Sequence, residues 1–264
     1  MSQILLGCDP EVFVKQAGIF RSAHGLIVGD KKNPQRVPRG AVQVDGMALE
    51  FNIDPVNNED DFCLNVVDVL NTMKRMVPDH EVVAVPVAHF EAAYLAAQPK
   101  EALELGCEPD YNAWTELANV RPDASRPMRT ASGHVHVGWD NGQSIDDPQH
   151  RSRCRMVAQN LDFFLGLASL EYDTDTLRRE MYGKAGAIRY KSYGVEYRTL
   201  SNAWLQSEKL IKWVFRAAHA GVSAAMEGRL LAEKYGDIQA IINTSDLKAA
   251  RKIIKAERLE VCLG

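Results

Sequence analysis

Residues 41–53 read AVQVDGMALEFNI, and Gly46 lies at the centre of this apolar stretch. Two apolar runs on either side of a short glycine-containing turn are typical of a β-hairpin. With a two-residue turn at its centre, Gln43 faces Glu50 across the hairpin, and cross-strand partners share one face of a sheet. The stretch therefore predicts two antiparallel strands whose common face carries Gln43, Asp45, Glu50 and Asn52.

Further strands are predicted on both sides of this hairpin, because apolar runs with strand-like alternation recur there. They cover residues 3–14 (broken at Pro10), 19–28 (a short hairpin), 81–88, 132–139, 186–191 and 194–201. Residues 30–40 are rich in basic residues, proline and glycine and are predicted to form a loop, and residues 106–130 are predicted to be irregular.

Helical spacing of apolar residues predicts helices at 60–77 and at about 147–171, the second capped by Asp147. From about residue 207 the chain is predicted to be mostly helical, with Ser207 as a cap, Gly236 as a stop and a last helix that begins at 244–246. Because the strands gather in hairpins, we expect one α+β domain over residues 1–264, with an antiparallel sheet and flanking helices.

The composition is that of an ordinary globular protein, with 264 residues, 46% hydrophobic residues and a net charge of −4. It has no basic excess of the kind that nucleic-acid binding uses. No apolar run is long enough to predict a membrane span, and the N-terminal residues do not resemble a signal peptide. The five cysteines include no CxxC pair, so reduced thiols in a cytoplasmic compartment are expected.

The informative residues are polar side chains at alternate positions of the predicted strands, since alternate residues face the same side of a sheet. Together with the hairpin they predict one polar face that carries Asp9, Glu11, Asp45, Glu50, His134, His136, Glu196 and Arg198. Each short motif alone is an ordinary solvated strand face. Jointly they place several carboxylates side by side, which requires either open water or bound cations.

The types of residue on this face indicate which cations and ligands it would bind. Carboxylates with imidazoles and no thiolate suit Mg²⁺ or Mn²⁺. Arg198, Arg189, Lys191 and the basic loop at 30–39 add positive charge beside the acidic groups. Metal ions with arginine and lysine side chains are what a nucleoside triphosphate requires. No phosphate-binding P-loop, serine-hydrolase or Rossmann motif is present in the sequence.

Five motifs in this order resemble the phage-type COOH–NH2 ligases (amidoligases) of the glutamine synthetase and glutamate–cysteine ligase superfamily. They are GCDPEVF at 7–13, GAVQVDGMALEFNIDP at 40–55, GCEPDYNAW at 106–114, RTASGHVHVGW at 129–139 and GKAGAIRYKSYGVEYRTLSNAW at 183–204. The resemblance implies a glutamine synthetase-like curved antiparallel sheet that holds ATP and Mg²⁺ (or Mn²⁺). It also implies a two-step reaction, in which an acyl phosphate forms from a carboxylate and is then displaced by an amine.

The resemblance also implies roles for single residues. Glu11, Asp45 and Glu50 resemble the metal cluster nearer the acyl substrate, and Asp9, His134 and Glu196 resemble the ligands of the metal that bridges the ATP phosphates. His136 would face those phosphates, and Arg129 and Lys184 are expected to bind the nucleotide. Arg198 resembles the arginine that steadies the transferred phosphoryl group, a role that Arg189 and Lys191 would share unless they bind the substrate carboxylate.

Several points stay open at this stage. Asp9 stands where the larger synthetases usually have glutamate. Glu108 and Asp110 would bind the amine, bind a third metal or cap a turn. Arg121, Arg126 and Arg129 would form either a lid over an anionic substrate or a solvated loop.

The substrates would be small-molecule or peptide carboxylates and amines, homo-oligomers are compatible with the resemblance, and a phage enzyme would act in the cytoplasm of its bacterial host. Three other functions compete. A guanidino-kinase-like phosphotransferase would need no amine, a divalent-metal hydrolase would need no ATP, and a non-catalytic binding or virion-associated protein would tolerate the loss of its acidic residues.

Overall fold

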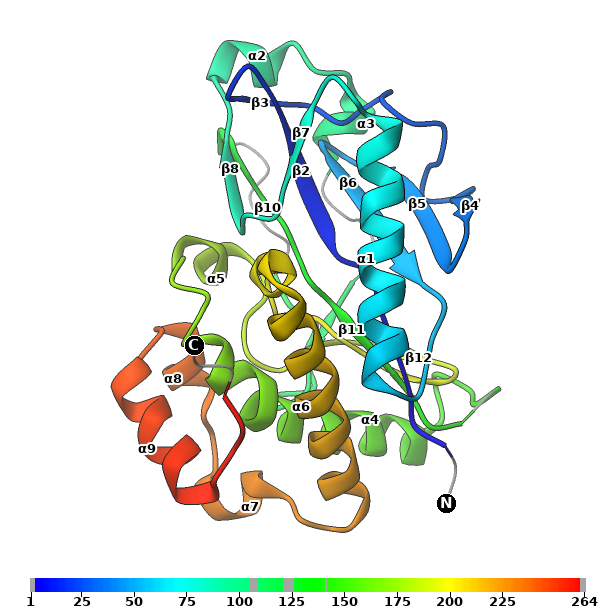
Figure 1. Cartoon of the computed structure of the whole chain (residues 1–264). Coiled ribbons are helices and arrows are strands. Elements are labelled where there is room, and N and C mark those ends of the chain that lie inside the picture. Colours follow the sequence, from blue (N-terminus) through cyan, green and yellow to red (C-terminus); the bar gives the residue numbers. More distant parts are fainter. Residues whose placement is uncertain (1–2, 105–108, 121–125, 141, 262–264) are drawn as a thin grey trace.

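The computed structural model describes residues 3–104, 109–120, 126–140 and 142–261 (Figure 1). The strands are β1 Leu5–Cys8, β2 Glu11–Gln16, β3 Ile19–Arg21, β4 Gln35–Val37, β5 Gly40–Asp45, β6 Ala48–Ile53, β7 Glu81–Val83, β8 Val87–His89, β9 Tyr111–Asn112, β10 Met128–Thr130, β11 Val135–Gly138, β12 Ala187–Lys191 and β13 Gly194–Tyr197. The helices are α1 Glu59–Met76, α2 Ala92–Ala96, α3 Lys100–Leu103, α4 Pro148–Leu161, η1 Asp162–Leu167, α5 Leu177–Met181, η2 Asn202–Gln206, α6 Glu208–Met226, α7 Leu231–Tyr235, α8 Gln239–Asn243 and α9 Leu247–Glu257.

All strand pairs given by the structure are antiparallel, as predicted, but they form three sheets instead of the single sheet that was expected. One sheet has the order β1-β11-β13-β12-β9, a second has the order β3-β2-β6-β5-β4 with β7 also paired to β2, and β8 pairs with β10. The chain is thus a mixture of helices and antiparallel sheets, which is compatible with the predicted α+β class.

The two larger sheets meet along one interrupted strand, formed by β1 and β2 on either side of Asp9 and Pro10. β1 pairs with β11, whereas β2 pairs with β6. Proline has no N–H to donate to a ladder, so the regular pairing stops at Pro10. The N–H groups of Asp9 and Glu11 still donate to the carbonyl groups of His134 and Ser132. The strand is therefore interrupted at Pro10, as predicted, and its two halves belong to different sheets that meet at this point.

The β5–β6 hairpin has the predicted register. Gln43 lies opposite Glu50, and Asp45 lies opposite Ala48. Gly46 has a φ of 58°, the left-handed conformation that such a tight turn needs. The hairpin is thus confirmed in both its limits and its pairing.

Four local predictions are wrong in part. β3 pairs with β2 through a turn at 17–18 instead of forming a hairpin within 19–28. The predicted loop at 30–40 contains β4. The predicted strand at 81–88 is two strands, because Pro86 separates β7 from β8. The chain after Tyr197 leaves the sheet and forms η2, where a longer strand was expected.

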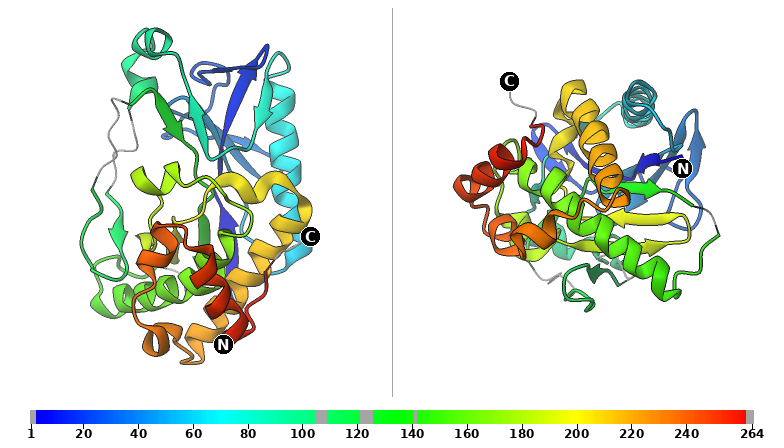
Figure 2. Two further views of the ribbon diagram at one scale, coloured as in Figure 1. Left: turned by 90° about the vertical axis from the view of Figure 1, so that its left-hand side faces the viewer. Right: turned by 90° about the horizontal axis from the view of Figure 1, so that it is seen from below.

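Helix α6 packs against both α1 and α4, and these helices cover one face of the sheets. α1 contacts β5 and β6, and α4 contacts β12 and β13. Figure 2 shows α1 and α6 on one side of the strands, with the segment around β9 on the other. On β13, Val195 and Tyr197 belong to the apolar core, while Glu196 between them points to the opposite face.

The predicted helix starts are confirmed by their caps. Side-chain oxygens of Asp147, Ser207 and Asp246 accept hydrogen bonds from backbone N–H groups in the first turns of α4, α6 and α9. The helix expected at 147–171 is regular only to Leu161 and continues as the π-helical segment η1. This local change directs the buried Asp162 towards Tyr197 and Trp114, which each donate a hydrogen bond of 2.7 Å to its carboxylate.

Across the described residues, no helix is long and apolar enough to cross a membrane. Cys8, Cys63 and Cys154 are buried free thiols, whereas Cys107 and Cys262 lie outside the described residues.

Candidate active site

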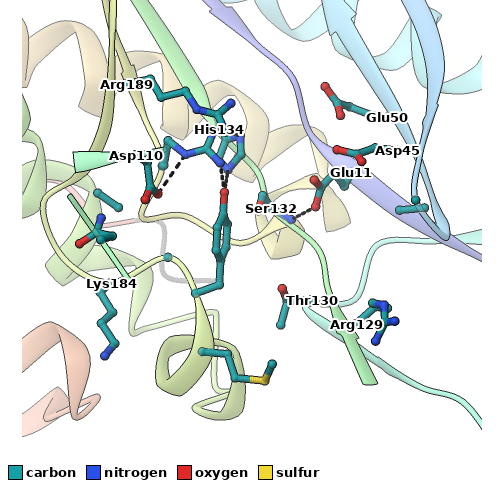
Figure 3. A pocket seen from close by; sticks show the side chains of 18 of the residues that line it. Glu11, Asp45, Glu50, Asp110, Arg129, Thr130, Ser132, His134, Lys184 and Arg189 are labelled. Carbon is teal, nitrogen blue, oxygen red and sulfur yellow. Dashed lines mark hydrogen bonds and ion pairs between the residues drawn. The ribbon is translucent and has the colours of Figure 1, made fainter. Parts of the chain in front are cut away.

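A cavity of about 1040 Å³ lies where the two larger sheets meet. Its walls come from β2, β5, β6, β10 and β12, together with residues 109–120 and 180–184. Figure 3 shows Glu11, Asp45 and Glu50 close together at one side of this cavity, and Asp110 and Lys184 at the other. The polar strand face predicted from the sequence is therefore the lining of a cavity and its immediate surroundings.

The first cluster of potential metal ligands consists of Asp9, His136 and Glu196, one from each of three neighbouring chain segments. We call it the histidine–carboxylate group. One ligating atom of each residue lies within 4.8 Å of the other two. Asp9 Oδ1 and His136 Nε2 lie 3.0 Å apart. Both atoms are buried, yet neither makes a well-oriented hydrogen bond. Buried polar atoms that lie this close without a well-oriented hydrogen bond are what a shared cation would satisfy.

The electrostatics of this group favour a charged carboxylate. Burial would raise the pKa of Asp9, but the imidazoles of His136 and His134 outweigh it and hold that pKa well below its usual range. Burial would lower the pKa of His136, and the charges of Asp9 and Glu196 raise it instead. The hydroxyl of Tyr193 contacts Nδ1 of His136. This contact fixes the ring so that Nε2 faces the carboxylates.

His134 lies beside this group but is held differently. Its Nδ1 is 3.3 Å from Asp9 Oδ1 and 3.6 Å from Glu196 Oε1, and its ring contacts that of Tyr182 at a tilt of 51°. Burial and the charge of Arg198 lower the pKa of His134 to about 3, so this ring is neutral. The sequence prediction made His134 a metal ligand and turned His136 towards the phosphates. In the structure His136 belongs to the ligand group, while His134 lies close to the same two carboxylates and lines the cavity. The division of roles between the two rings stays a prediction.

The second cluster, which we call the triple-carboxylate group, consists of Glu11, Asp45 and Glu50. Their ligating oxygens also lie within 4.8 Å of one another. Burial and the charge of Asp45 raise the pKa of Glu11 to about 7, and burial with the neighbouring carboxylates raises that of Glu50 well above its usual value. Lys31 offsets part of this charge through an ion pair of 2.7 Å with Asp45. The basic loop predicted beside the acidic face thus contributes this lysine.

Three predicted cations surround the buried carboxylate of Glu196. Lys191 Nζ lies 2.9 Å from its Oε2, and Arg189 Nη1 lies 3.6 Å from its Oε1. Arg198, just after the end of β13, contacts Oε1 and also pairs with Asp110 at 3.3 Å. Arg189, Lys191 and Arg198 all line the cavity. The predicted strand alternation therefore brings together the acid and the cations as expected.

Tyr182 is a residue of the site that the sequence did not single out. Its hydroxyl contacts Arg198 Nη2 and lies 3.5 Å from Nε2 of His134. The guanidinium groups of Arg178 and Arg198 lie 5.4 Å and 5.5 Å from the centre of its ring. Tyr182 directly precedes the motif that starts at Gly183, so its closeness to that motif was the one available signal.

The remaining predicted site residues lie at different places along the cavity. Lys184 and Arg129 both line it, on opposite sides in Figure 3. Arg126 is exposed at its edge. Asp110 pairs with Arg198, and this contact is one that the sequence did not foresee. Glu108 and Arg121 lie outside the described residues.

Residues 130–242 match the model of the family described as phage phiEco32-like COOH.NH2 ligase-type 2. This match confirms the family resemblance seen in the sequence and supports a carboxylate–amine ligase in general. It covers β11, β12 and β13 with their histidines, basic residues and Glu196, whereas the triple-carboxylate group lies outside it. No curated protein matches the chain.

Proposed function

We propose that the chain is an ATP- and Mg²⁺-dependent carboxylate–amine ligase with a glutamine synthetase-like catalytic domain over residues 1–264. One observation carries the proposal: two separate groups of potential metal ligands border one cavity and lie beside a set of arginine and lysine side chains. In the proposed reaction, a substrate carboxylate oxygen bonds to the γ-phosphorus of ATP and releases ADP. An amine then attacks the acyl carbon and releases phosphate, which leaves an amide.

The residues present fit divalent cations with a preference for oxygen ligands. The histidine–carboxylate group offers two carboxylates and one imidazole, and the triple-carboxylate group offers three carboxylates. Neither contains a thiolate, so Mg²⁺ or Mn²⁺ suits them better than zinc. When bound, such cations would neutralise phosphate oxygens and the repulsion among the carboxylates.

The chain's own cations would bind and orient the phosphates. Arg198 is buried and is held by Asp110, Glu196 and Tyr182, so its guanidinium is fixed before any substrate binds. A preorganised cation stabilises a charge that develops on the transferred group without reorganising. Arg189 and Lys191 extend from the adjacent strand β12, and Lys184 lines the same side of the cavity. We assign nucleotide and phosphoryl binding to these four residues, with His134 as a neutral neighbour.

The cavity has room for more than a nucleotide. Its volume of about 1040 Å³ is at the upper end of the ~300–1,000 Å³ typical of small-molecule sites. The triple-carboxylate group lies on the side away from Lys184, and we place the acyl substrate there. A carboxylate and an amine, free or within peptides, are the substrates of such a reaction, and the bacterial cytoplasm is where we expect it to occur.

Calorimetric titration of the protein with a non-hydrolysable ATP analogue, with and without Mg²⁺, tests this proposal. We expect binding that requires the metal and that is lost in Glu196→Gln but kept in the exposed control Glu233→Gln. Saturation at ~100 times the Kd would stabilise the fold by about 2.7 kcal/mol. Absence of nucleotide binding with either Mg²⁺ or Mn²⁺ would refute the proposal and favour a metal-dependent hydrolase or a non-catalytic protein. Release of ADP without any need for an amine would favour a phosphotransferase.

A further inference from the structure

The tight turn from Gly183 to Gly186 carries Lys184, one of the four residues to which we assign nucleotide and phosphoryl binding. Lys184 is exposed and lines the cavity (Figure 3). Gly183 and Gly186 have φ angles of 67° and 73°, in the left-handed region that favours glycine. An added Cβ on Gly183 would collide with the guanidinium of Arg178, and one on Gly186 with the ring of Trp114. Two glycines in so short a turn would let its backbone take other conformations unless neighbouring groups hold it.

Hydrogen bonds hold the backbone of this turn on two sides of the lysine. The carbonyl oxygen of Lys184 accepts from the hydroxyl of Thr199 at 3.1 Å. The N–H of the next residue, Ala185, donates to Oδ1 of Asn243 at 2.8 Å. Ala185 is fully buried, so water cannot replace Asn243 as the acceptor without a local opening of the structure. The bond to Asn243 therefore restrains the backbone directly beside Lys184.

Asn243 belongs to the C-terminal helices, and α6 to α9 provide none of the described residues that line the cavity. It is the last residue of α8. Ile238 and Ile242 anchor this helix because both are buried in the main apolar core, and α8 contacts η1. At the first turn of α8, Gln239 Oε1 accepts a hydrogen bond of 2.7 Å from Nδ2 of Asn112. Helix α8 is thus a fixed element from which Asn243 reaches the turn.

We propose that Asn243 is a positioning residue for the nucleotide, because it holds the turn in the conformation that directs Lys184 into the cavity. This inference rests on the proposed function, which assigns the nucleotide to Lys184. A lysine side chain has many rotamers, and a fixed backbone reduces the conformational entropy that is lost when its ammonium binds a phosphate. The competing explanation is that Asn243 stabilises the fold without any effect on the site. The two explanations differ in whether the nucleotide responds to Asn243 through Lys184.

Calorimetry with the full chain, Mg²⁺ and a non-hydrolysable ATP analogue measures this response as a double-mutant cycle. Asn243→Ala should weaken binding of the analogue at least about threefold, the effect of one ordinary hydrogen bond. In the Lys184→Ala background the same change should have no further effect, because the side chain that the turn positions is absent. Asn243→Asp keeps an acceptor oxygen at the same place and should bind the analogue like the wild type. The exposed control Thr244→Ala, whose hydroxyl donates to the carbonyl of Ala240, should leave binding unchanged.

Hydrogen exchange without ligand gives a second readout that is independent of the nucleotide. In Asn243→Ala the amides of residues 183–187 should exchange at least about tenfold faster than in the wild type, since the turn opens more easily. The amides of β11 should keep their wild-type rates, which shows that the variant is folded. Asn243→Ser, with a side chain too short to keep the bond to Ala185, is a second variant with the same expected result.

Unchanged exchange in the turn of Asn243→Ala overturns the inference, and so does faster exchange with unchanged affinity for the analogue. An equal loss of affinity in the Lys184→Ala background also overturns it, because Asn243 would then act on the site without the lysine. So does a Lys184→Ala variant that binds the analogue as tightly as the wild type. Failure of the wild type to bind the analogue would refute the proposed function, and the exchange rates would still decide whether Asn243 holds the turn.

Discussion

Glu11→Gln is expected to stabilise the metal-free protein while removing much of its stabilisation by Mg²⁺. Burial and Asp45 raise the pKa of Glu11 from 4.5 to about 7. When the pKa of a carboxyl is higher in the folded state than in the unfolded state, the fold is most stable at a pH below the unfolded-state pKa. That stability is lost as the pH rises through the folded-state pKa. At pH 8 the charged Glu11 therefore costs the fold about 3 kcal/mol, at ~1.36 kcal/mol per pKa unit. At pH 5 the same cost is under about 1 kcal/mol.

Glutamine has the same shape, and its oxygen can still accept the 2.8 Å hydrogen bond that Ser132 N–H donates to Glu11. Chemical denaturation in EDTA should therefore show a gain of about 2 to 3 kcal/mol for the variant at pH 8 and little gain at pH 5. Added Mg²⁺ should stabilise the wild type markedly and the variant much less, because one ligand is gone. The exposed control Glu101→Gln should show neither effect. If Glu11→Gln is less stable than the wild type at pH 8 in EDTA, or if Mg²⁺ stabilises both equally, the triple-carboxylate group is not a repulsive cluster that awaits a cation.

Three further changes test other parts of the structure. Asp162→Asn should flatten the pH dependence of unfolding between pH 4 and 7 by about 2 kcal/mol, because burial raises the pKa of Asp162 to about 6 and its charging costs stability as pH rises. A variant with the wild-type pH profile would contradict this. Gly133→Ala should lower the free energy of unfolding, measured with denaturant, by at least about 3 kcal/mol, since an added Cβ would collide with Trp204 Nε1 and the Ser201 carbonyl. The control Gly7→Ala should change it by no more than about 1 kcal/mol, because its Cβ would meet atoms no closer than 3.7 Å. Arg198→Lys should lower turnover, measured as ADP release, by about 100-fold, because an ammonium cannot contact Asp110, Glu196 and Tyr182 together; activity near that of the wild type would remove Arg198 from the proposed role.

The parts of the site that follow strand periodicity were predictable from the sequence. Alternation places Glu196 of β13 and Arg198, just beyond its end, on the same side of the chain, and the hairpin register places Glu50 opposite Gln43. Both predictions depend only on the two-residue repeat of a strand and on a turn whose length is visible in the sequence. Such local rules also identified the caps of α4, α6 and α9.

What depends on tertiary packing was not predictable in this way. Alternation puts His134 and His136 on the same face but does not say which ring approaches Glu196, since that depends on how β1 and β13 flank β11. Tyr182 reaches Arg198 from the C-terminal end of α5, a segment distant in sequence from the strand that carries the arginine. The π-helical turn that begins at Asp162 accompanies hydrogen bonds from Trp114 and Tyr197 that no local pattern reveals.

The interruption at Pro10 explains why two ligand groups exist instead of one. Asp9 and Glu11 are only two residues apart and both reach the cavity, yet Asp9 directly follows the strand paired in one sheet and Glu11 is paired in the other. Asp9 therefore meets residues of β11 and β13, while Glu11 meets residues of β5 and β6. Each group gathers beside one sheet, and the two groups come to border one cavity because the sheets meet along this strand. In an unbroken strand, alternation would place the two carboxylates side by side on one face. The proline between them instead assigns one carboxylate to each of two groups at the edge of one cavity.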